Sequence, residues 1–325
     1  MRPLAVAEGP ARTQLGHLAR RFSHSDGAEA VLDGPRSGLH IVTGFGPTNA
    51  PTAGTLSVML GVVELQRQLG AEMTVVVSEL GAWNSRNVPW AQLEGVRDQM
   101  LGFLRVLGFD EPHGRLRSHL DFGNLARAGK IARFLTREDF LAHREELLEL
   151  YADHGLLGSE IGLTVDALYT VADILGPAEA GATRTLMVSG VEEAYFAALA
   201  RLVLERQAMA DELSLGWRST IGALYFRVLP GLGGYPKMSK SIPASAIHLG
   251  MPVDELRARI RSDAPEDQAP LLTAMELASG WQEDRLAVAR EVFAQRARDV
   301  GEWHRLKEDY LVCFLEFAER WRACA

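Results

Sequence analysis

Cysteine is scarce in this sequence, as are lysine and long hydrophobic runs. The 325 residues include only two cysteines, Cys313 and Cys324, both near the C-terminus. Two cysteines can form neither a disulfide framework nor a cysteine-based zinc site, so we expect a reducing compartment, the cytoplasm. No apolar run approaches the roughly 18–20 residues that a transmembrane helix needs, and the N-terminus lacks a hydrophobic signal core. We therefore expect no membrane partner.

The sequence also lacks an excess of positive charge. Its formal net charge is −8 and its isoelectric point is about 5.7. These values argue against indiscriminate binding to polyanions but leave room for a local basic patch. The hydrophobic fraction of 47% is sufficient for a sizeable core. A chain of this length predicts one large domain, or one large domain with a small one.

Lysine is rare: of the 34 basic residues, four are lysine and the rest are arginine. Two of the four lysines lie in one segment. Residues 237–241 read Lys-Met-Ser-Lys-Ser and follow a run at 230–236 that is rich in glycine and proline. That composition predicts a loop. A lysine in an arginine-rich chain suggests a compact, mobile point charge, and charged loops commonly carry function. A solvated surface turn is the ordinary alternative.

One stretch of the sequence has the pattern of a βαβ unit. Buried strands are expected at 39–44 and 73–78, and the second is almost continuously β-branched. A helix at 56–69 lies between them and is closed by Gly70. Two strands joined in this way are parallel, with a right-handed crossover. The expected fold class is therefore α/β, with a Rossmann-like parallel sheet.

The loop between the first strand and the helix is the expected ligand site. In a parallel sheet, ligands lie beyond the carboxyl ends of the strands, next to a helix N-terminus whose free N–H groups favour phosphate. Thr52 or Thr55 is the expected N-cap of the helix. Gly54 has no Cβ atom, so a ligand could approach the backbone closely there.

Two segments together resemble the ATP-binding motifs of class I aminoacyl-tRNA synthetases. The first is Pro-Thr at 47–48 followed by Thr-Ala-Gly-Thr at 52–55, at a helix start. The second is the Lys-Met-Ser-Lys-Ser segment at 237–241, which we call the lysine loop. Their order along the chain, on a βαβ unit and then on a loop, matches the family. The resemblance implies a class I synthetase catalytic domain that uses ATP and Mg²⁺.

The same resemblance implies roles for individual residues. Lys237 and Lys240 would neutralise the leaving pyrophosphate together with Mg²⁺, and Thr52 and Thr55 would face the phosphates. No protein ligand for a metal is implied. The remaining ATP-binding residues would form the floor of the nucleotide site, reach the ribose or set the conformation of the lysine loop: Thr43, Gly44, Gly46, Pro47, Thr48, Gly54, Gly190, Glu192, Met238, Ser239 and Ser241.

An apolar helix expected at 167–175 carries one acid, Asp173. Its Ala-Asp-Ile-Leu segment resembles the one by which tryptophanyl- and tyrosyl-tRNA synthetases place an acid in the amino-acid pocket. An N-cap or a surface position is the ordinary interpretation. A carboxylate in the pocket would accept a hydrogen bond from an indole N–H or a phenol O–H. Residues 243–249 resemble the continuation of the lysine loop in the tryptophanyl branch, so tryptophan is the expected substrate.

Three departures from the family pattern concern the phosphate and amino-group contacts. Thr55 stands where a histidine or an asparagine is usual, and it can donate a hydrogen bond but carries no charge. Glu192 and Glu193 stand where Asp-Gln is usual. Asp166 occupies a position commonly held by tyrosine, so Asp166 and Glu193 would surround the α-ammonium group unless the alignment is one helical turn out. Tyr169, on the same helix, is the remaining expected amino-acid-binding residue.

The expected organisation has an N-terminal helix and linker at 1–38, the catalytic domain at 39–250 and a helical domain at 251–325. Six large side chains near the C-terminus recur at steps of three and four, which is typical of a helix packed on a core; a base-stacking surface is the alternative. They are Trp303, Leu306, Tyr310, Phe314, Phe317 and Trp321. Further helices are expected at 11–22, 90–109, 137–152 and 282–298, and a linker at 23–38. A strand is expected at 186–190, followed by a glycine turn and a long helix that ends at about residue 209.

The function implied is activation of an aromatic amino acid, tryptophan first, to the aminoacyl-adenylate and its transfer to tRNA, by a homodimer. Two alternatives remain: a diverged relative that activates an amino acid for a specialised metabolite, and a catalytically silent protein that kept the fold. Residues 242–325 carry eleven Lys and Arg against fifteen Asp and Glu. Only Arg257, Arg259 and Arg261 are clustered there, with 296 and 298 a weaker pair. We therefore expect weak binding of tRNA.

Overall fold

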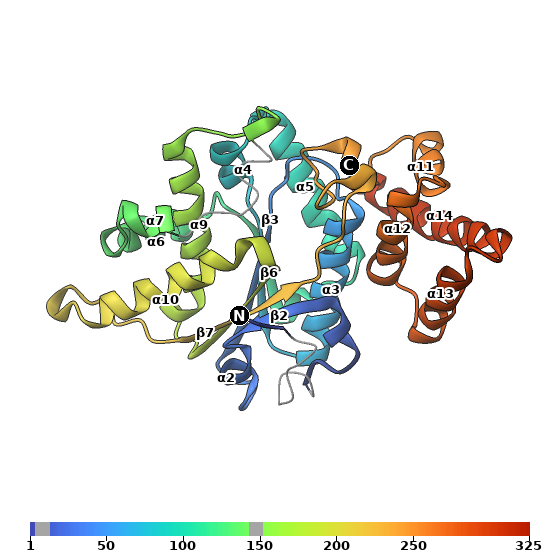
Figure 1. The fold of residues 1–325 in the computed structure, drawn as a ribbon. Helices are drawn as coiled ribbons and strands as arrows, with labels where there is room; N and C mark the ends of the chain where they lie inside the picture. Colours follow the sequence, from blue (N-terminus) through green and yellow to red (C-terminus); the bar gives the residue numbers. More distant parts are fainter. Residues whose placement is uncertain (4–13, 143–151) are drawn as a thin grey trace. The chain divides into compact units, whose positions relative to one another are not determined.

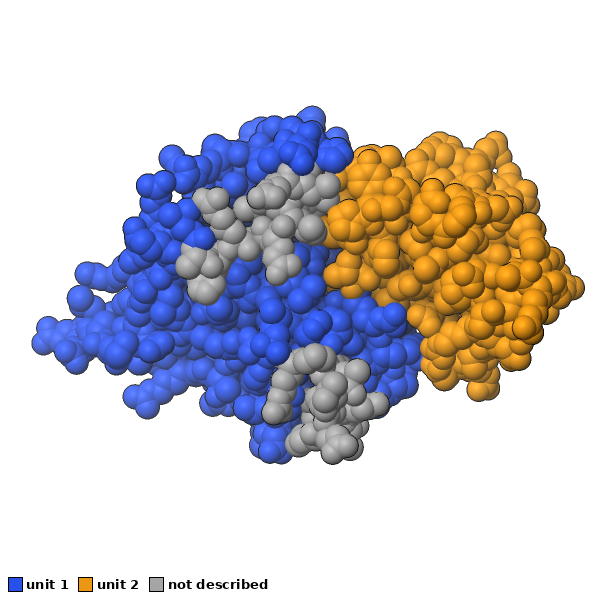
Figure 2. All heavy atoms as spheres, viewed as in Figure 1, with its two compact units in different colours: residues 1–48, 62–97, 108–227 blue, residues 49–61, 98–107, 228–325 orange. Residues whose placement is uncertain are grey.

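The computed structural model describes residues 1–3, 14–142 and 152–325 (Figure 1). The chain divides into two compact units, each made of several segments (Figure 2). Unit 1 comprises Met1–Thr48, Val62–Arg97 and Gly108–Arg227. Unit 2 comprises Asn49–Gly61, Asp98–Leu107 and Val228–Ala325. Each unit combines segments that are far apart in the chain. The expected domain limits at 38 and 250, which divide the chain into consecutive pieces, stay predictions.

Unit 1 is built on a sheet that has seven strands among the described residues, in the order β1-β2-β7-β6-β3-β4-β5. The strands from β7 to β5 run parallel, whereas β1 and β2 pair antiparallel at one edge. The predicted α/β fold with a Rossmann-like parallel sheet is confirmed. The strands span Arg2–Pro3 (β1), Phe22–Asp26 (β2), Leu39–Phe45 (β3), Glu72–Val77 (β4), Gly114–Ser118 (β5), Arg184–Gly190 (β6) and Thr220–Phe226 (β7).

The predicted βαβ unit is present as β3, helix α3 (Ala53–Leu69) and β4. β4 is buried along most of its length, as its β-branched sequence predicts. The Oγ1 atom of Thr52 accepts a hydrogen bond of 3.2 Å from the Thr55 N–H group, so Thr52 caps the helix. Gly70 follows the helix with φ of +53°, a left-handed conformation that favours glycine and ends the helix.

The expectation of a linker at 23–38 is wrong, because this stretch holds most of β2 and helix α2 (Ala28–Leu32). β2 pairs antiparallel with β7, and Val31 and Leu32 of α2 are buried. The polar composition reflects a strand near the edge of the sheet, where alternate side chains reach solvent. Of the helix expected at 11–22, residues 14 and 15 are helical, Gly16–Arg21 form a 3-10 helix, and Phe22 already belongs to β2. Residues 4–13 lie outside the described residues.

The other helices of unit 1 are α4 (Glu79–Ser85), α5 (Trp90–Val106, whose second half belongs to unit 2), α6 (Phe122–Ile131), α7 (Arg137–Ala142), α9 (Glu160–Glu179) and α10 (Ala194–Ala208). Residues 143–151 of the helix expected at 137–152 lie outside the described residues. By length and composition alone, α9 could cross a membrane. However, half of the apolar stretch of α9 is buried, and the helix packs against α4, α6 and α10. Such packing is typical of the core helix of a folded protein.

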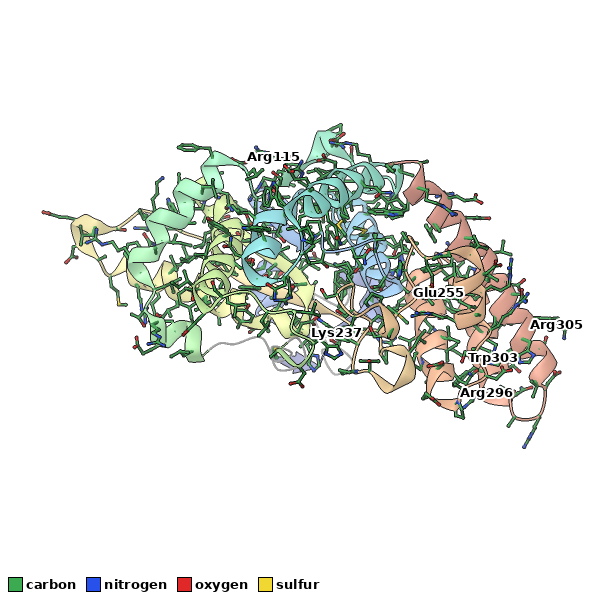
Figure 3. The ribbon with its side chains drawn as sticks, turned by 90° about the horizontal axis from the view of Figure 1, so that it is seen from above. Arg115, Lys237, Glu255, Arg296, Trp303 and Arg305 are labelled. Atoms are coloured by element: carbon green, nitrogen blue, oxygen red, sulfur yellow. The ribbon has the colours of Figure 1, made fainter. Side chains whose placement is uncertain are left out.

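The C-terminal part of unit 2 is helical, as predicted: α11 (Val253–Ile260), α12 (Pro265–Ala278), α13 (Glu283–Gln295) and α14 (Val300–Arg322). In α14, Trp303, Tyr310 and Trp321 are buried, which confirms that the aromatic stripe is a packing surface. The Nε1 atom of Trp303 (labelled in Figure 3) donates a 2.6 Å hydrogen bond to Gln268. Lys307 is also buried and donates to two carbonyl oxygens at the C-terminal end of α11.

Candidate active site

Unit 2 brings the two predicted motif segments together. An antiparallel bridge between Thr52 and His248 joins the start of α3 to the segment that follows the lysine loop, and a 2.9 Å backbone hydrogen bond flanks it on each side. The Nζ atom of Lys240 donates a 3.4 Å hydrogen bond to the Oγ1 atom of Thr55. A Cβ atom on Gly54 would stand 3.5 Å from Thr52 Oγ1, an ordinary contact, so packing alone does not require a glycine there.

The lysine loop is held by its own hydrogen bonds and is not a freely solvated turn. The Ser239 N–H group donates to Ser245 Oγ at 3.0 Å, and Ser239 Oγ accepts from the Ser241 N–H group at 3.3 Å. Met238 is buried. Figure 3 shows Lys237 on this irregular segment, which precedes α11. The loop residues predicted to set the loop's conformation therefore lie where they can do so.

Two helices of unit 2 also hold the segment around the lysine loop. Asp267 of α12 accepts a 2.8 Å hydrogen bond from the Gly233 N–H group. Gly233 has φ of +61°, a left-handed conformation that favours glycine. Arg259 of α11 donates hydrogen bonds of 2.7 Å to the carbonyl oxygens of Pro243 and Ala246. The segment is thus tied on both sides of its lysines.

In unit 1, the predicted nucleotide residues lie in the second half of strand β3 and directly after it. Thr43 is 4% exposed, and its Oγ1 atom is buried with no hydrogen-bond partner among the described residues. A Cβ atom on Gly44 would lie 3.3 Å from a backbone oxygen of β4, so the two strands approach closely there. The carbonyl oxygen of Thr48 accepts a 2.7 Å hydrogen bond from a glutamine of α5. The contact of Thr43 with a nucleotide stays a prediction.

The turn after β6 carries the other predicted ribose residues. Gly190 ends the strand, and Glu192 and Glu193 form a 3-10 turn that leads into α10. A Cβ atom on Gly190 would stand 2.4 Å from a carboxylate oxygen of Glu192, so a side chain there would displace that carboxylate. The carboxylate of Glu192 therefore lies over the backbone at the carboxyl end of β6.

Asp173 lies in a buried ionic network of unit 1. It is 5% exposed, one carboxylate oxygen accepts from Arg117, and the other accepts from His119 Nε2 at 2.8 Å. Arg117 lies in β5 and His119 follows that strand. Burial raises the pKa of the Asp173 carboxyl, but the charge and hydrogen bonds of His119 and then Arg117 outweigh burial. The net result is a pKa below the usual 3.8.

His119 links the network to helix α4. Its Nδ1 atom accepts a 3.2 Å hydrogen bond from the Gly81 N–H group, and its side chain is 1% exposed. Burial lowers the pKa of His119, while Asp173 and then Asp166 raise it, and the net direction is upward from 6.5. The Gly81 N–H group opposes that rise, because a ring protonated on Nδ1 cannot accept its hydrogen bond.

Three of the predicted amino-acid-binding residues meet at this network. Asp166 lies against Gly81, where a Cβ atom would stand 2.2 Å from an Asp166 carboxylate oxygen. The ring of Tyr169 meets that of His119 edge-on, with centroids 5.7 Å apart. Asp166, Tyr169 and Asp173 therefore share one cluster on α9, whereas Glu193 precedes α10.

Sequence reasoning missed several members of this cluster. Glu79, fully buried at the start of α4, accepts from Arg97 at 3.4 Å and from the His119 N–H group at 3.3 Å. Arg117 and His119 were also missed. The signal that could have found them is the alternation of Arg115, Arg117 and His119, which is the period of a strand. Because the alternating residues are charged rather than apolar, β5 did not stand out.

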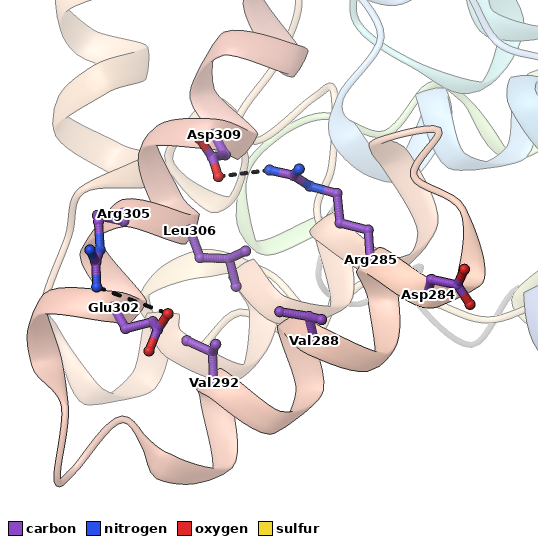
Figure 4. Close-up of a pocket in the computed structure, with 8 residues that line it drawn as sticks. All are labelled: Asp284, Arg285, Val288, Val292, Glu302, Arg305, Leu306 and Asp309. Atoms are coloured by element: carbon purple, nitrogen blue, oxygen red, sulfur yellow. Dashed lines mark hydrogen bonds and ion pairs between the residues drawn. The ribbon is translucent and has the colours of Figure 1, made fainter.

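A groove of about 520 Å³ lies between α13 and α14 of unit 2 (Figure 4). It has an apolar floor and ion pairs at its rim, and none of the predicted site residues lines it. Its lining is Val288, Val292 and Leu306 with Asp284, Arg285, Asp309, Glu302 and Arg305.

In the described part of the chain, no three or more His, Cys, Asp and Glu side chains form a group that could hold a metal ion.

Comparison with known proteins identifies the fold. No family model matches the sequence, and no curated protein sequence matches it. Tryptophanyl-tRNA synthetase from the archaeon Aeropyrum pernix K1 superposes with a TM-score of 0.69 at 16% identity, over 99% of this chain and 89% of that one. Tyrosyl-tRNA synthetase from Archaeoglobus fulgidus, complexed with L-tyrosine, gives 0.71 at 18% identity, over 96% and 98%.

A third solved structure agrees with these two. Tryptophanyl-tRNA synthetase from Encephalitozoon cuniculi, bound to tryptophan, gives a TM-score of 0.69 at 16% identity, over 97% of this chain and 89% of that one. The chain has the fold of the tryptophanyl- and tyrosyl-tRNA synthetases, and the resemblance inferred from the sequence is confirmed at that level. At this identity, the likeness concerns the fold and leaves the choice between tryptophan and tyrosine open.

Proposed function

We propose that the protein joins an aromatic amino acid, tryptophan first among the candidates, to the AMP moiety of ATP and then transfers the acyl group to tRNA. The observation that carries this proposal is the hydrogen bond between Lys240 and Thr55 in unit 2, which unites the two predicted ATP motifs. The fold shared with tryptophanyl- and tyrosyl-tRNA synthetases supports it.

In the activation step, an oxygen of the amino-acid carboxylate attacks the α-phosphorus of ATP. The bond from that phosphorus to the oxygen bridging to the β-phosphate breaks, and pyrophosphate leaves. Negative charge builds on the leaving group, so cations held beside it stabilise the transition state. Lys240, fixed on a hydrogen-bonded loop, and Lys237 would supply compact charges. Thr52 and Thr55 would add hydroxyl groups at the start of a helix, where anions are favoured.

Mg²⁺ fits this site as a companion of the nucleotide. Mg²⁺ keeps several waters and is commonly held through substrate phosphates with one or two carboxylates. When bound, Mg²⁺ would neutralise phosphate charge, in addition to what Lys237 and Lys240 contribute.

Asp173 is the proposed reader of the aromatic side chain. Both of its oxygens already accept hydrogen bonds from Arg117 and His119. Each carboxylate oxygen has two lone pairs, so an indole N–H or a phenol O–H would share an oxygen with one of these donors. Arg117 and His119 would keep Asp173 ionised in spite of burial, and only the ionised form offers all of its lone pairs to a substrate.

A second candidate function is activation of an amino acid for a purpose other than protein synthesis, and one observation favours it. The main cationic cluster of the C-terminal part is neutralised, because Arg257, Arg259 and Arg261 pair at 2.5–2.6 Å with Asp254, Glu255 and Glu308. Cations that are already paired neutralise fewer phosphates of a nucleic acid. This arrangement favours an acceptor other than tRNA.

The decisive experiment is ATP–pyrophosphate exchange with each of the twenty amino acids in turn. We expect exchange with tryptophan to be the fastest. If neither tryptophan nor tyrosine supports exchange, the aromatic assignment fails. Acylation of total tRNA by the same preparation then separates the two candidates. Exchange without acylation would favour the second function over the first.

A further inference from the structure

We propose that His248 is an ATP-contacting residue of the site in unit 2, whose Nε2–H group donates a hydrogen bond to a phosphate oxygen. The inference rests on the proposed function, because it assumes that ATP binds where Lys240 and Thr55 meet. His248 belongs to the segment at 243–249 that resembles the tryptophanyl branch, and that resemblance implies no chemical role for its side chain.

The backbone places His248 opposite Thr52. The two flanking hydrogen bonds, each 2.9 Å long, join the residues on either side of the pair and not the pair itself. This pattern marks a non-hydrogen-bonded antiparallel pair, whose Cα atoms are about 4.5 Å apart and whose side chains leave the same face of the ribbon close together. The imidazole of His248 therefore leaves the backbone on the same side as the Thr52 hydroxyl.

That side also carries the other phosphate candidates. The Oγ1 atoms of Thr52 and Thr55 are 3.4 Å apart, and Lys240 Nζ reaches Thr55 Oγ1 at 3.4 Å. Thr52 is buried, whereas Thr55, Lys240 and His248 are partly exposed. A cation, two hydroxyl groups and an imidazole are thus presented from two segments of unit 2. All of these groups can donate hydrogen bonds, which is the chemistry that an oligophosphate needs.

The surroundings of the His248 imidazole determine which of its two nitrogens can contact the ligand. The Nδ1 atom is buried, has no hydrogen-bond partner among the described residues, and lies 3.6 Å from where a Cβ atom on Gly250 would stand. Nε2 is therefore the nitrogen that a ligand can reach. Burial and then the charge of Arg259 lower the pKa of His248 below 6.5, with Glu255 opposing. The ring is neutral near pH 7 and can carry its proton on Nε2.

Neutrality gives His248 a role distinct from that of the lysines. A neutral donor adds a directed hydrogen bond to phosphate without adding charge, whereas a lysine acts as a point charge. Arg259 supports this role in two ways, because it ties down the segment at 243–246 and also disfavours protonation of the ring. The alternative is that His248 only fills space between the bridge, Gly250 and α11.

Three substitutions separate a ligand contact from packing. His248→Gln places an amide nitrogen near the position of Nε2, His248→Asn places one near that of Nδ1, and His248→Ala removes both. His304→Ala is the control, because His304 is exposed on α14 and pairs with Asp263 at 2.9 Å, away from the lysine loop. Each variant is measured by calorimetric titration with Mg-ATP, by ATP–pyrophosphate exchange with tryptophan and by thermal unfolding.

We expect His248→Ala and His248→Asn to weaken ATP binding, or to lower kcat of exchange, by roughly 10- to 100-fold, as loss of a hydrogen bond to a charged group predicts. His248→Gln should retain most of the wild-type value, and His304→Ala should match the wild type. The KM for tryptophan should stay unchanged in all four. A nucleotide effect that glutamine rescues and asparagine does not is one that a packing residue would not produce.

The outcomes also separate this inference from the proposed function. Unchanged ATP affinity and exchange in His248→Ala would overturn the inference, as would equal losses in the glutamine and asparagine variants with a lowered Tm. If the wild type binds ATP but exchanges with no amino acid, the proposed function fails. The inference then stands or falls on the ATP affinity of His248→Ala. A wild type that binds no ATP overturns both.

Discussion

The Nζ atom of Lys240 lies 3.4 Å from the Oγ1 atom of Thr55, although 185 residues separate them in the sequence. The antiparallel bridge between Thr52 and His248 supports this approach, because it fixes the start of α3 against the segment that follows the lysine loop. A helix start favours anions, and a lysine beside it adds a full positive charge. Unit 2 therefore offers both groups to the same anionic ligand.

Replacing Lys240 tests this arrangement. Lys240→Ala should lower kcat of ATP–pyrophosphate exchange by about 100-fold or more, because a charge that stabilises the transition state is lost. Its free energy of unfolding should change by no more than about 0.5 kcal/mol, since the side chain is partly exposed and leaves no cavity. Lys130→Ala is the control, because Lys130 pairs with Glu179 in unit 1. Equal exchange rates for wild type and Lys240→Ala would show that pyrophosphate does not leave at this loop.

Asp173→Ala tests how the aromatic side chain is read. If the carboxylate accepts a hydrogen bond from substrate, kcat/KM for tryptophan or tyrosine should fall far more than that for phenylalanine. The variant should also lose about 3–5 kcal/mol of stability, because Arg117 is left buried without its acid. His119→Gln is a milder variant that removes the ring but keeps a donor for Asp173. Equal losses for every substrate in both variants would make Asp173 purely structural.

Gly81 is predicted to be required by the cluster around His119. Gly81→Ala should destabilise the protein by about 1–3 kcal/mol, because the new methyl group would overlap an Asp166 oxygen. Gly95→Ala is the matched control: nothing lies within 4 Å of its Cβ position on α5, so it should stabilise by up to about 1 kcal/mol. Urea unfolding gives both values. Adding Asp166→Ala to Gly81→Ala should recover much of the loss, and strict additivity would contradict the overlap.

The sequence predicted strands β3, β4 and β6 of the sheet and missed β2, β5 and β7. β3 and β4 are apolar and β-branched because neighbouring elements cover both faces, and this signal is local. β2 and β5 contain serine, histidine and arginine, and their pairing with β7 and β4 depends on contacts between residues far apart in the chain. β2 has no run of apolar residues to mark it as a strand, so it was taken for a linker, and β5 has only an alternation of charged residues, which did not stand out.

The candidate site divides in the same way. Lys240 and Thr55 belong to contiguous motifs, so the sequence could name both, and the structure adds their contact. Asp173 could be named from its segment, but its partners could not. Arg117 and His119 reach it through side-chain hydrogen bonds from β5 and from the residue that follows that strand, and neither residue stands in a motif. His248 could be named only once its pairing with Thr52 was known.

A pH dependence is predicted for His40 of β3. Burial lowers its pKa to about 4, and its Nε2 atom lies 2.8 Å from Thr74 Oγ1. Between the unfolded value of 6.5 and about 4, the unfolded chain binds a proton that the folded chain does not, so stability falls as the pH falls through this window. The loss from this residue should reach about 3 kcal/mol. His40→Gln should flatten that part of the pH profile in urea unfolding. Parallel profiles for variant and wild type would contradict this assignment.

The C-terminal helices are predicted to discriminate poorly between anticodons. Among residues 242–325, acids outnumber bases by fifteen to eleven. Arg259 and Arg261, in the main cationic cluster, already pair with Glu255 and Glu308. A basic surface needs cations that are free to meet phosphate, and this pairing removes them from that role.

If wild-type protein charges tRNA, changing the anticodon should alter kcat/KM far less than the roughly 5- to 150-fold that one misread base costs where bases are read. The double variant Glu255→Gln, Glu308→Gln should remove the negative charges that neutralise Arg259 and Arg261, while Arg259 keeps its hydrogen bonds to the carbonyl oxygens of the segment at 243–246. Its affinity for total tRNA should then rise, and its salt dependence should steepen by up to about two phosphate contacts. Filter binding from 50 to 200 mM salt measures both quantities. A large anticodon effect in the wild type, with no change in the double variant, would show that these helices read tRNA through other residues and would defeat the prediction.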